Sequence, residues 1–233
     1  IKQGSRDIIN EAFRVLRTNL EFMLDAKIEN KASVTLFTSF NPGSGKTFLT
    51  MNTAATFAMK GKRILVIDGD LRHRSASAYL GSQHKGLSDY LGKRESCLDA
   101  LVQENPDIPG FFLLPAGTIP PNPTELLAEP LFKETIEQLR GHYDYILIDC
   151  PPIDIVADTQ IIEKLADRTV FVVRAGLLER DMLSELQRMY DEKRFKNMAL
   201  LLNGTEGGGN RYGYRYGYKY GYKYGYGSKN YYK

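Results

Sequence analysis

The sequence of 233 residues has no tryptophan, two cysteines and no apolar stretch long enough to cross a membrane. Cys97 and Cys150 cannot build a disulfide framework, so a reducing compartment such as the cytoplasm is expected. A membrane-spanning helix needs about 20 mostly apolar residues in succession, which excludes a membrane span here. An initial methionine and a signal-peptide pattern are also missing, and we therefore expect a piece excised from a longer protein.

The end of the chain lacks acidic and aliphatic residues. From Gly207 onward there are 6 lysines and arginines, no Asp or Glu, and 10 of the 15 tyrosines. The first 206 residues keep 25 basic and 28 acidic side chains, a net charge of −3. A basic-Tyr-Gly-Tyr unit recurs, starting at Arg211, Arg215, Lys219 and Lys223. With little apolar surface to bury, residues 207–233 are predicted to be a flexible tail that is disordered when isolated.

Short apolar runs that do not alternate with polar residues indicate strands buried on both faces. They lie at residues 34–37, 64–67, 145–148, 169–173 and 198–202, with a weaker candidate at 111–114. An Ala-rich helix is predicted at residues 48–59, between the first two runs. We therefore predict an α/β fold over residues 1–206, with a doubly wound, mostly parallel sheet flanked by helices. The chemistry is then expected at the carboxyl ends of the strands.

Residues 1–27 contain a predicted amphipathic helix, over about residues 5–26. Its apolar positions recur at spacings of three or four, which places them on one face. These positions are Ile9, Phe13, Leu16 and Leu20.

A glycine-rich loop follows the first apolar run. Residues 39–47 are Ser-Phe-Asn-Pro-Gly-Ser-Gly-Lys-Thr, with Phe40 where the usual phosphate-binding loop has a glycine. Glycines let backbone N–H groups close around phosphate oxygens, and the following helix N-terminus adds partial positive charge. The lysine places a mobile cation on the phosphates, and the threonine hydroxyl can ligate Mg²⁺. The predicted nucleotide-binding residues are Gly43, Ser44, Gly45, Lys46, Thr47 and Phe48.

Two other apolar runs end in aspartates. Residues 64–67 lead into Asp68-Gly69-Asp70, and residues 145–148 lead into Asp149. Parallel strands end at one edge of a sheet, so these carboxylates are expected beside the phosphate loop, where a metal is needed. Asp68 and Asp70, two residues apart after one strand, can divide the labour. One can then face the metal while the other accepts a hydroxyl proton as general base.

These motifs resemble those of the bacterial tyrosine kinases. The resemblance rests on residues 43–47 (Walker A), 64–72 (Walker A′) and 146–152 (Walker B), and on the C-terminal tyrosine cluster. Residues 11–17 are similar to the family's ExxRxxR oligomerisation motif. The resemblance covers essentially the whole chain. Its specific part is the Walker A′ motif with the tyrosine tail, because Walker A and B occur in many ATPases.

The resemblance implies transfer of the γ-phosphoryl group of ATP, with Mg²⁺, to tyrosine hydroxyls. It assigns catalysis to Lys46, Asp68 and Asp70, without deciding which aspartate is the base, and metal binding to Thr47, Asp68 and Asp149. The implied phosphoacceptors are Tyr212, Tyr214, Tyr216, Tyr218, Tyr220, Tyr222, Tyr224, Tyr226, Tyr231 and Tyr232.

The resemblance also implies a ring-shaped homo-oligomer, in which the tail of one subunit enters its neighbour's active site. Glu11, Arg14 and Arg17 are the implied contact residues. On a helical wheel they fall on the flank opposite the apolar face, although an intrahelical Glu–Arg pair on a solvated face is an alternative. Family members act in capsule or exopolysaccharide export at the cytoplasmic side of the bacterial inner membrane. A membrane-anchored part or adaptor, and a cognate phosphatase, are therefore expected partners.

Two alternatives remain at this point. The body could be a partition- or cell-division-type switch ATPase without a protein substrate, although Asn41 stands where those ATPases carry a signature lysine. The tail could stack on nucleic-acid bases, but the small net charge argues against a general nucleic-acid-binding protein. Asn203 could contact adenine or form a turn, and Cys150 is interpreted as a buried small residue.

Overall fold

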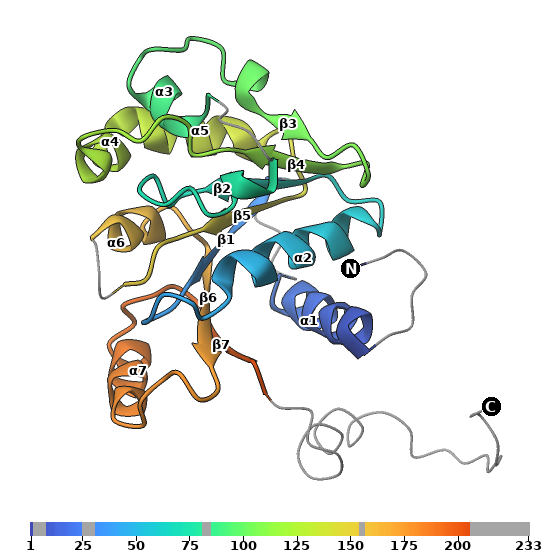
Figure 1. Ribbon diagram of the computed structural model, residues 1–233, viewed down its shortest axis with the longest axis vertical. Helices are drawn as coiled ribbons and strands as arrows, with labels where there is room; N and C mark the ends of the chain where they lie inside the picture. Colours follow the sequence, from blue (N-terminus) through green and yellow to red (C-terminus); the bar gives the residue numbers. More distant parts are fainter. Residues whose placement is uncertain (2–7, 25–30, 81–84, 154–156, 206–233) are drawn as a thin grey trace, which may run out of the picture. The chain divides into compact units, whose positions relative to one another are not determined.

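A single β-sheet with helices on both faces organises the computed structural model (Figure 1). The structure describes residues 1, 8–24, 31–80, 85–153 and 157–205. The chain divides into two units, Ile1–Asn203 and Gly204–Lys233. The predicted tail and its tyrosines lie outside the described residues. Within the described ranges, no helix has the length and apolar character needed to cross a membrane.

The sheet has the order β3-β4-β2-β5-β1-β6-β7, and every neighbouring pair is parallel except β3–β4. This confirms the predicted α/β class with a mostly parallel sheet. The weaker strand candidate is confirmed as β4, whereas the sequence did not indicate the short antiparallel β3. The strands are β1 (Ser33–Thr38), β2 (Ile64–Asp68), β3 (Gln103–Glu104), β4 (Phe111–Leu114), β5 (Tyr145–Asp149), β6 (Arg168–Arg174) and β7 (Met198–Asn203).

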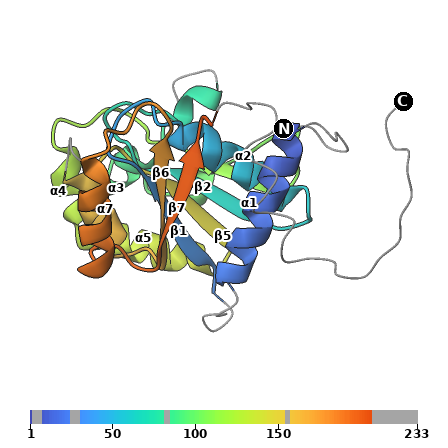
Figure 2. The ribbon, with the colours of Figure 1, turned by 90° about the horizontal axis from the view of Figure 1, so that it is seen from below.

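Helices cover both faces of this sheet (Figure 2). Successive residues of a strand point to opposite faces, so Leu36 packs in the core under α3–α6 while Phe37 packs in the core under α1 and α2. A third cluster joins Phe171 of β6 to α7. The α-helices are α1 (Ile8–Leu24), α2 (Lys46–Ala58), α3 (Leu87–Leu91), α4 (Pro123–Ala128), α5 (Pro130–Arg140), α6 (Asp158–Glu163) and α7 (Met182–Asp191), with 3₁₀ turns at Ser77–Leu80 and Asp99–Leu101.

Helix α1 runs beside α2, and this explains one error of the sequence prediction. Phe13 and Leu20 are buried as expected, but the Ile9 side chain is 60% exposed. Phe13 already contacts Phe48 in the first turn of α2, with ring centroids 5.8 Å apart. Ile9 lies one turn earlier, beyond the start of α2, and therefore has no helix to cover it.

Helix α2 begins at Lys46, two residues before the predicted start, because the phosphate loop runs directly into its first turn. Gly45 precedes it with a φ of 91°, and Gly61 follows its end with a φ of 81°. Both values lie in the left-handed region that favours glycine. The helix therefore starts and stops where glycine permits the chain to turn.

Candidate active site

The phosphate loop lies between the end of β1 and the start of α2. Gly43 and Gly45 have φ values of 74° and 91°. A Cβ atom at Gly45 would lie 2.4 Å from Nδ2 of Asn203, so a larger residue would strain the loop and also collide with β7. The Lys46 side chain, at the helix N-terminus, is almost fully buried. The sequence prediction of a close backbone loop ending in a lysine is consistent with this geometry.

Side chains from two other strands hold the loop from outside. Arg174, at the end of β6, donates from Nη1 to the carbonyl oxygen of Gly43 at 2.6 Å. Asn203, at the end of β7, donates from Nδ2 to the carbonyl oxygen of Ser44 at 2.9 Å. Both bonds use carbonyl oxygens, so they do not consume the N–H groups that a phosphate needs. Sequence reasoning missed Arg174 and considered Asn203 for adenine or a turn, not for a loop contact.

Thr47 and Asp149 meet at the edge of the sheet. The Thr47 hydroxyl donates to Oδ2 of Asp149 at 2.6 Å. The other carboxylate oxygen of Asp149 is buried and has no hydrogen-bond partner among the described residues. Burial raises the pKa of Asp149 to about 7. A buried oxygen without a partner is costly, and a cation bound there would remove that cost.

Asp68 ends β2 directly beside Asp149 in the strand register. Its Oδ2 accepts two hydrogen bonds from Ser77, from the backbone N–H at 2.7 Å and from the hydroxyl at 2.6 Å. Burial raises the pKa of Asp68 to about 6, although the Ser77 hydrogen bonds act in the opposite direction. The Ser77 hydroxyl in turn accepts from the N–H of Ala116, at 2.9 Å. This contact joins the Pro-rich segment at residues 115–123 to the same rim.

Asp70 is held differently. Its Oδ1 accepts from the backbone N–H groups of Arg72, at 3.2 Å, and His73, at 3.0 Å. The His73 ring nitrogen Nδ1 lies 3.3 Å from the same oxygen. The Asp70 side chain is only 8% exposed, so the loop after β2 positions it firmly.

One lysine faces this group of carboxylates. Burial lowers the pKa of Lys46, while Asp149 and Asp70 act to raise it. The Lys46 ammonium therefore faces the carboxyl groups of Asp149 and Asp70. The thiol of Cys150, next to Asp149, is also buried, which raises its pKa well above the ordinary value and makes it a poor nucleophile.

The donor set fits Mg²⁺ bound together with a nucleotide. Mg²⁺ is usually held by one or two carboxylates, water and substrate phosphates. Thr47 and Asp149 supply a hydroxyl and a carboxylate oxygen at one point. Asp68 is adjacent but engaged by Ser77. Among the described residues no three His, Cys, Asp or Glu side chains form a metal cluster, so the phosphates would complete the coordination.

Other predicted site residues lie elsewhere. The Phe48 side chain faces α1, in edge contact with Phe13. Phe40, in place of the usual glycine, is buried and packs edge-on against Phe171, with centroids 5.0 Å apart. The residue that departs from the usual loop pattern thus contributes a side chain to the core.

The three residues of the predicted oligomerisation motif are not equally placed. Glu11 and Arg14 form an intrahelical ion pair on the exposed side of α1. Arg17 instead donates from Nη1 to the carbonyl oxygen of Thr56 on α2, at 3.2 Å, within the same chain. The structure thus places Arg17 beside the helix that α1 packs against, which corrects the expectation that all three residues lie on the flank opposite the apolar face.

The chain is similar to several known proteins. A family model described as an AAA domain matches residues 33–192. The tyrosine-protein kinase YwqD of Bacillus subtilis is 33% identical over 202 residues, which are 86% of this chain and 83% of YwqD. AmsA of Erwinia amylovora is 39% identical over 191 residues, or 81% of this chain, but the match spans 25% of AmsA. The kinase domain of the Escherichia coli tyrosine kinase ETK superposes with a TM-score of 0.76 at 32% identity, covering 89% of this chain and 80% of that domain.

The buried charge at Asp68 predicts a pH-dependent effect of Asp68→Asn on stability. The folded-state pKa of Asp68 is raised, to about 6. The contribution of its protonated carboxyl group to folded-state stability is therefore fully present below the unfolded-state pKa. It is lost as the pH rises through 6. The free energy of unfolding of the uncharged variant, relative to that of the wild type, should therefore be roughly 1 kcal/mol higher at pH 8 than at pH 5.

Urea unfolding without nucleotide, at both pH values, measures this difference. Asp107→Asn, on an exposed turn, is the control and should show no comparable gain. A stability difference for Asp68→Asn that is the same at pH 5 and pH 8 would contradict a strained buried charge at this position.

Proposed function

The chain belongs to the bacterial tyrosine kinases, and on that premise we propose that it phosphorylates the tyrosines of its own C-terminal segment between subunits. The observation that supports this most strongly is the convergence of Lys46, Thr47 and Asp149 with the two aspartates of the Walker A′ loop at one sheet edge. ATP would be the phosphoryl donor. Mg²⁺, held at Thr47 and Asp149, would supply charge neutralisation for the phosphates.

The described residues then have distinct tasks in transfer. Lys46 contacts the phosphates from the helix N-terminus. Asp68 or Asp70 accepts the proton of the incoming tyrosine hydroxyl. The tyrosine oxygen bonds to the γ-phosphorus, and the bond between that phosphorus and the oxygen of the leaving ADP breaks. The raised pKa of Asp68, about 6, lies near the operating pH, which suits a general base. Placement of the reactants by these buried groups accounts for most of the rate gain.

The tail supplies the acceptors in this proposal. It carries 10 tyrosines, 6 basic residues and no acidic residue. Each phosphate adds a charge of about −1.5 to −2, so roughly four phosphates would cancel the basic charge of the tail. The body carries −3. The unmodified tail would dock on acidic surface and be released after phosphorylation. The number of phosphates on the tail would then matter more for release than their positions.

We infer further that the chain regulates capsule or exopolysaccharide synthesis and export from the cytoplasmic side of the bacterial inner membrane. A membrane-anchored segment or adaptor would hold it there, and a cognate phosphatase would reset the tail. This inference is supported by the family to which the chain belongs. Its match to a quarter of AmsA is consistent with a kinase unit that works with further segments.

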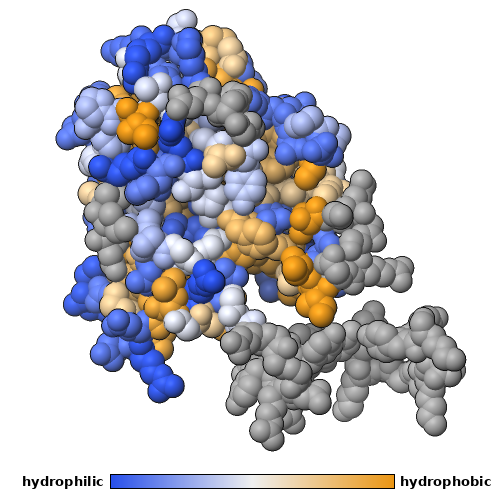
Figure 3. Space-filling model, viewed as in Figure 1, coloured by the Kyte–Doolittle hydropathy of each residue, from blue (hydrophilic) through white to orange (hydrophobic). Residues whose placement is uncertain are grey.

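The surface of α1 supports an assembly of several copies. Besides Glu11 and Arg14, it exposes three apolar side chains seven residues apart, Ile8 (85%), Val15 (58%) and Phe22 (74%). A seven-residue spacing places these three on one stripe of the helix. Apolar side chains gather on this side of the molecule (Figure 3). We propose that this stripe and the neighbouring charges contact the next subunit of the ring.

Incubation of the purified chain with Mg-ATP, followed by mass spectrometry, tests the kinase proposal. Phosphotyrosine is expected between Tyr212 and Tyr232, and Lys46→Met should lose at least 99% of it because the phosphate-binding cation is gone. Lys60→Met, which removes an exposed lysine paired with Glu21, is the matched control and should keep it. Hydrolysis of ATP without phosphotyrosine would instead indicate a switch ATPase.

Replacement of Glu11, Arg14 and Arg17 with alanine should convert the oligomer to a monomer, as measured by size-exclusion chromatography with light scattering. The charges that flank the apolar stripe would be lost together. The pair Glu185 and Arg188 on α7 has the same spacing and also forms an ion pair, so its double alanine variant is the control. An unchanged elution volume for the α1 variant would refute the contact.

A further inference from the structure

A closed polar network lies next to the Walker A′ loop. Asp158, in the first turn of α6, accepts hydrogen bonds from Arg72 Nε at 3.1 Å and from the Thr124 hydroxyl at 2.6 Å. Arg72 also donates from Nη2 to the Thr124 hydroxyl oxygen, at 3.0 Å. Residues from three separate segments, the loop after β2, the start of α4 and the start of α6, therefore form a triangle of hydrogen bonds.

This triangle differs from a surface ion pair. The Asp158 side chain has no exposed surface, whereas that of Arg72 is 36% exposed. A fully buried carboxylate needs both a counter-charge and hydrogen bonds. Arg72 and Thr124 supply them from two directions. The planar guanidinium uses two different nitrogens, so its orientation is fixed and not merely its charge.

The fixed arginine also supports a site aspartate. The backbone N–H of Arg72 donates to Oδ1 of Asp70, which accepts a second N–H from His73. The residue whose side chain is locked by Asp158 is thus the one that holds the Asp70 carboxylate through its main chain. A shift of Arg72 would carry the Asp70 carboxylate with it.

The same network reaches the Walker B segment. Thr159, directly after Asp158, donates from its hydroxyl to the carbonyl oxygen of Pro151 at 2.8 Å. Thr38, at the end of β1, donates to the same oxygen at 2.9 Å. Pro151 lies two residues after Asp149. The start of α6 is therefore tied to the segment that follows one site carboxylate, while Arg72 ties it to the other.

We propose that Arg72 is a positioning residue for phosphoryl transfer, and that Thr124 and Asp158 hold it so that the Asp70 carboxylate keeps its place relative to Asp149. The inference rests on the proposed kinase function. Arg72 acts through Asp70 and not by contact with the reacting atoms. A misplacement of about 1 Å in such a group can lower a rate 10²-fold without weakening nucleotide binding.

Steady-state transfer to a tagged Lys46→Met chain, used as tail-bearing acceptor, tests the proposal. Arg72→Ala should lower kcat about 100-fold while the Kd for Mg-ADP changes less than threefold. Thr124→Val, which exchanges one hydroxyl for a methyl group, should lower kcat about tenfold, and Thr124→Ser should restore it. A merely structural role would not separate kcat from nucleotide affinity.

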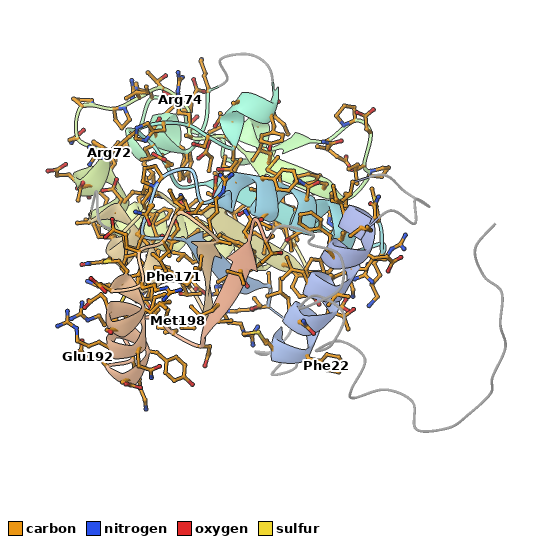
Figure 4. All side chains as sticks on the ribbon, turned by 60° about the horizontal axis from the view of Figure 1, so that its bottom comes forward. Phe22, Arg72, Arg74, Phe171, Glu192 and Met198 are labelled. Atoms are coloured by element: carbon orange, nitrogen blue, oxygen red, sulfur yellow. The ribbon has the colours of Figure 1, made fainter. Side chains whose placement is uncertain are left out.

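Arg74→Ala is the matched control. It removes another arginine from the same loop (Figure 4). No hydrogen bond or ion pair of the Arg74 side chain occurs among the described residues. Its kcat should stay within twofold of the wild type. Wild-type kcat in both Arg72→Ala and Thr124→Val would overturn the inference, while wild-type transfer to the acceptor would leave the kinase proposal standing.

If the wild-type enzyme forms no phosphotyrosine, the kinase proposal is overturned instead. In that case a crystal structure of Thr124→Val decides the positioning claim directly. An Asp70 carboxylate displaced by about 1 Å supports it, and a carboxylate that stays in place overturns it. Thr124→Val also serves if Arg72→Ala fails to fold, because Arg72 is still present in this variant and neutralises the buried Asp158 carboxylate.

Discussion

Burial of three carboxyl groups beside one lysine, at the carboxyl edge of the sheet, is the constraint on which the site depends. Parallel pairing of β2 with β5 places Asp68 next to Asp149, and burial raises the pKa of both. The hydrogen bonds from Ser77 and Thr47 reduce this cost but do not remove it. A metal–nucleotide complex bound there would bring cationic charge to the carboxylates and phosphate to Lys46.

The same edge shows what could be predicted from the sequence. Non-alternating apolar runs predict buried parallel strands, and strands followed by Gly-Lys-Thr or by aspartates predict where the site lies. The supports of that site were not predictable. Arg72 meets Asp158 across 86 positions of the chain, and Arg174 meets Gly43 across 131. No local spacing signals such contacts, because they depend on how distant segments pack.

Helix α1 shows the opposite limit, where a local pattern predicts too much. Its period correctly indicates a buried face, but the extent of that face depends on where α2 begins. Ile9 is therefore exposed, and Arg17 contacts α2. What remains on the outside, an ion pair and an apolar stripe, is suited to a neighbouring copy. In the assembly proposed above, tethering would raise the local concentration of the tail tyrosines as acceptors.

The dependence of nucleotide affinity on Mg²⁺ tests the central claim, that the buried carboxylates form a metal–nucleotide site. The Kd for ADP, measured by calorimetry with and without Mg²⁺, should fall at least tenfold when the metal is present. Asp149→Asn should lose most of this gain, because the variant removes the charge of the carboxylate whose buried oxygen has no hydrogen-bond partner among the described residues. Equal affinities with and without Mg²⁺ in the wild type would contradict the account.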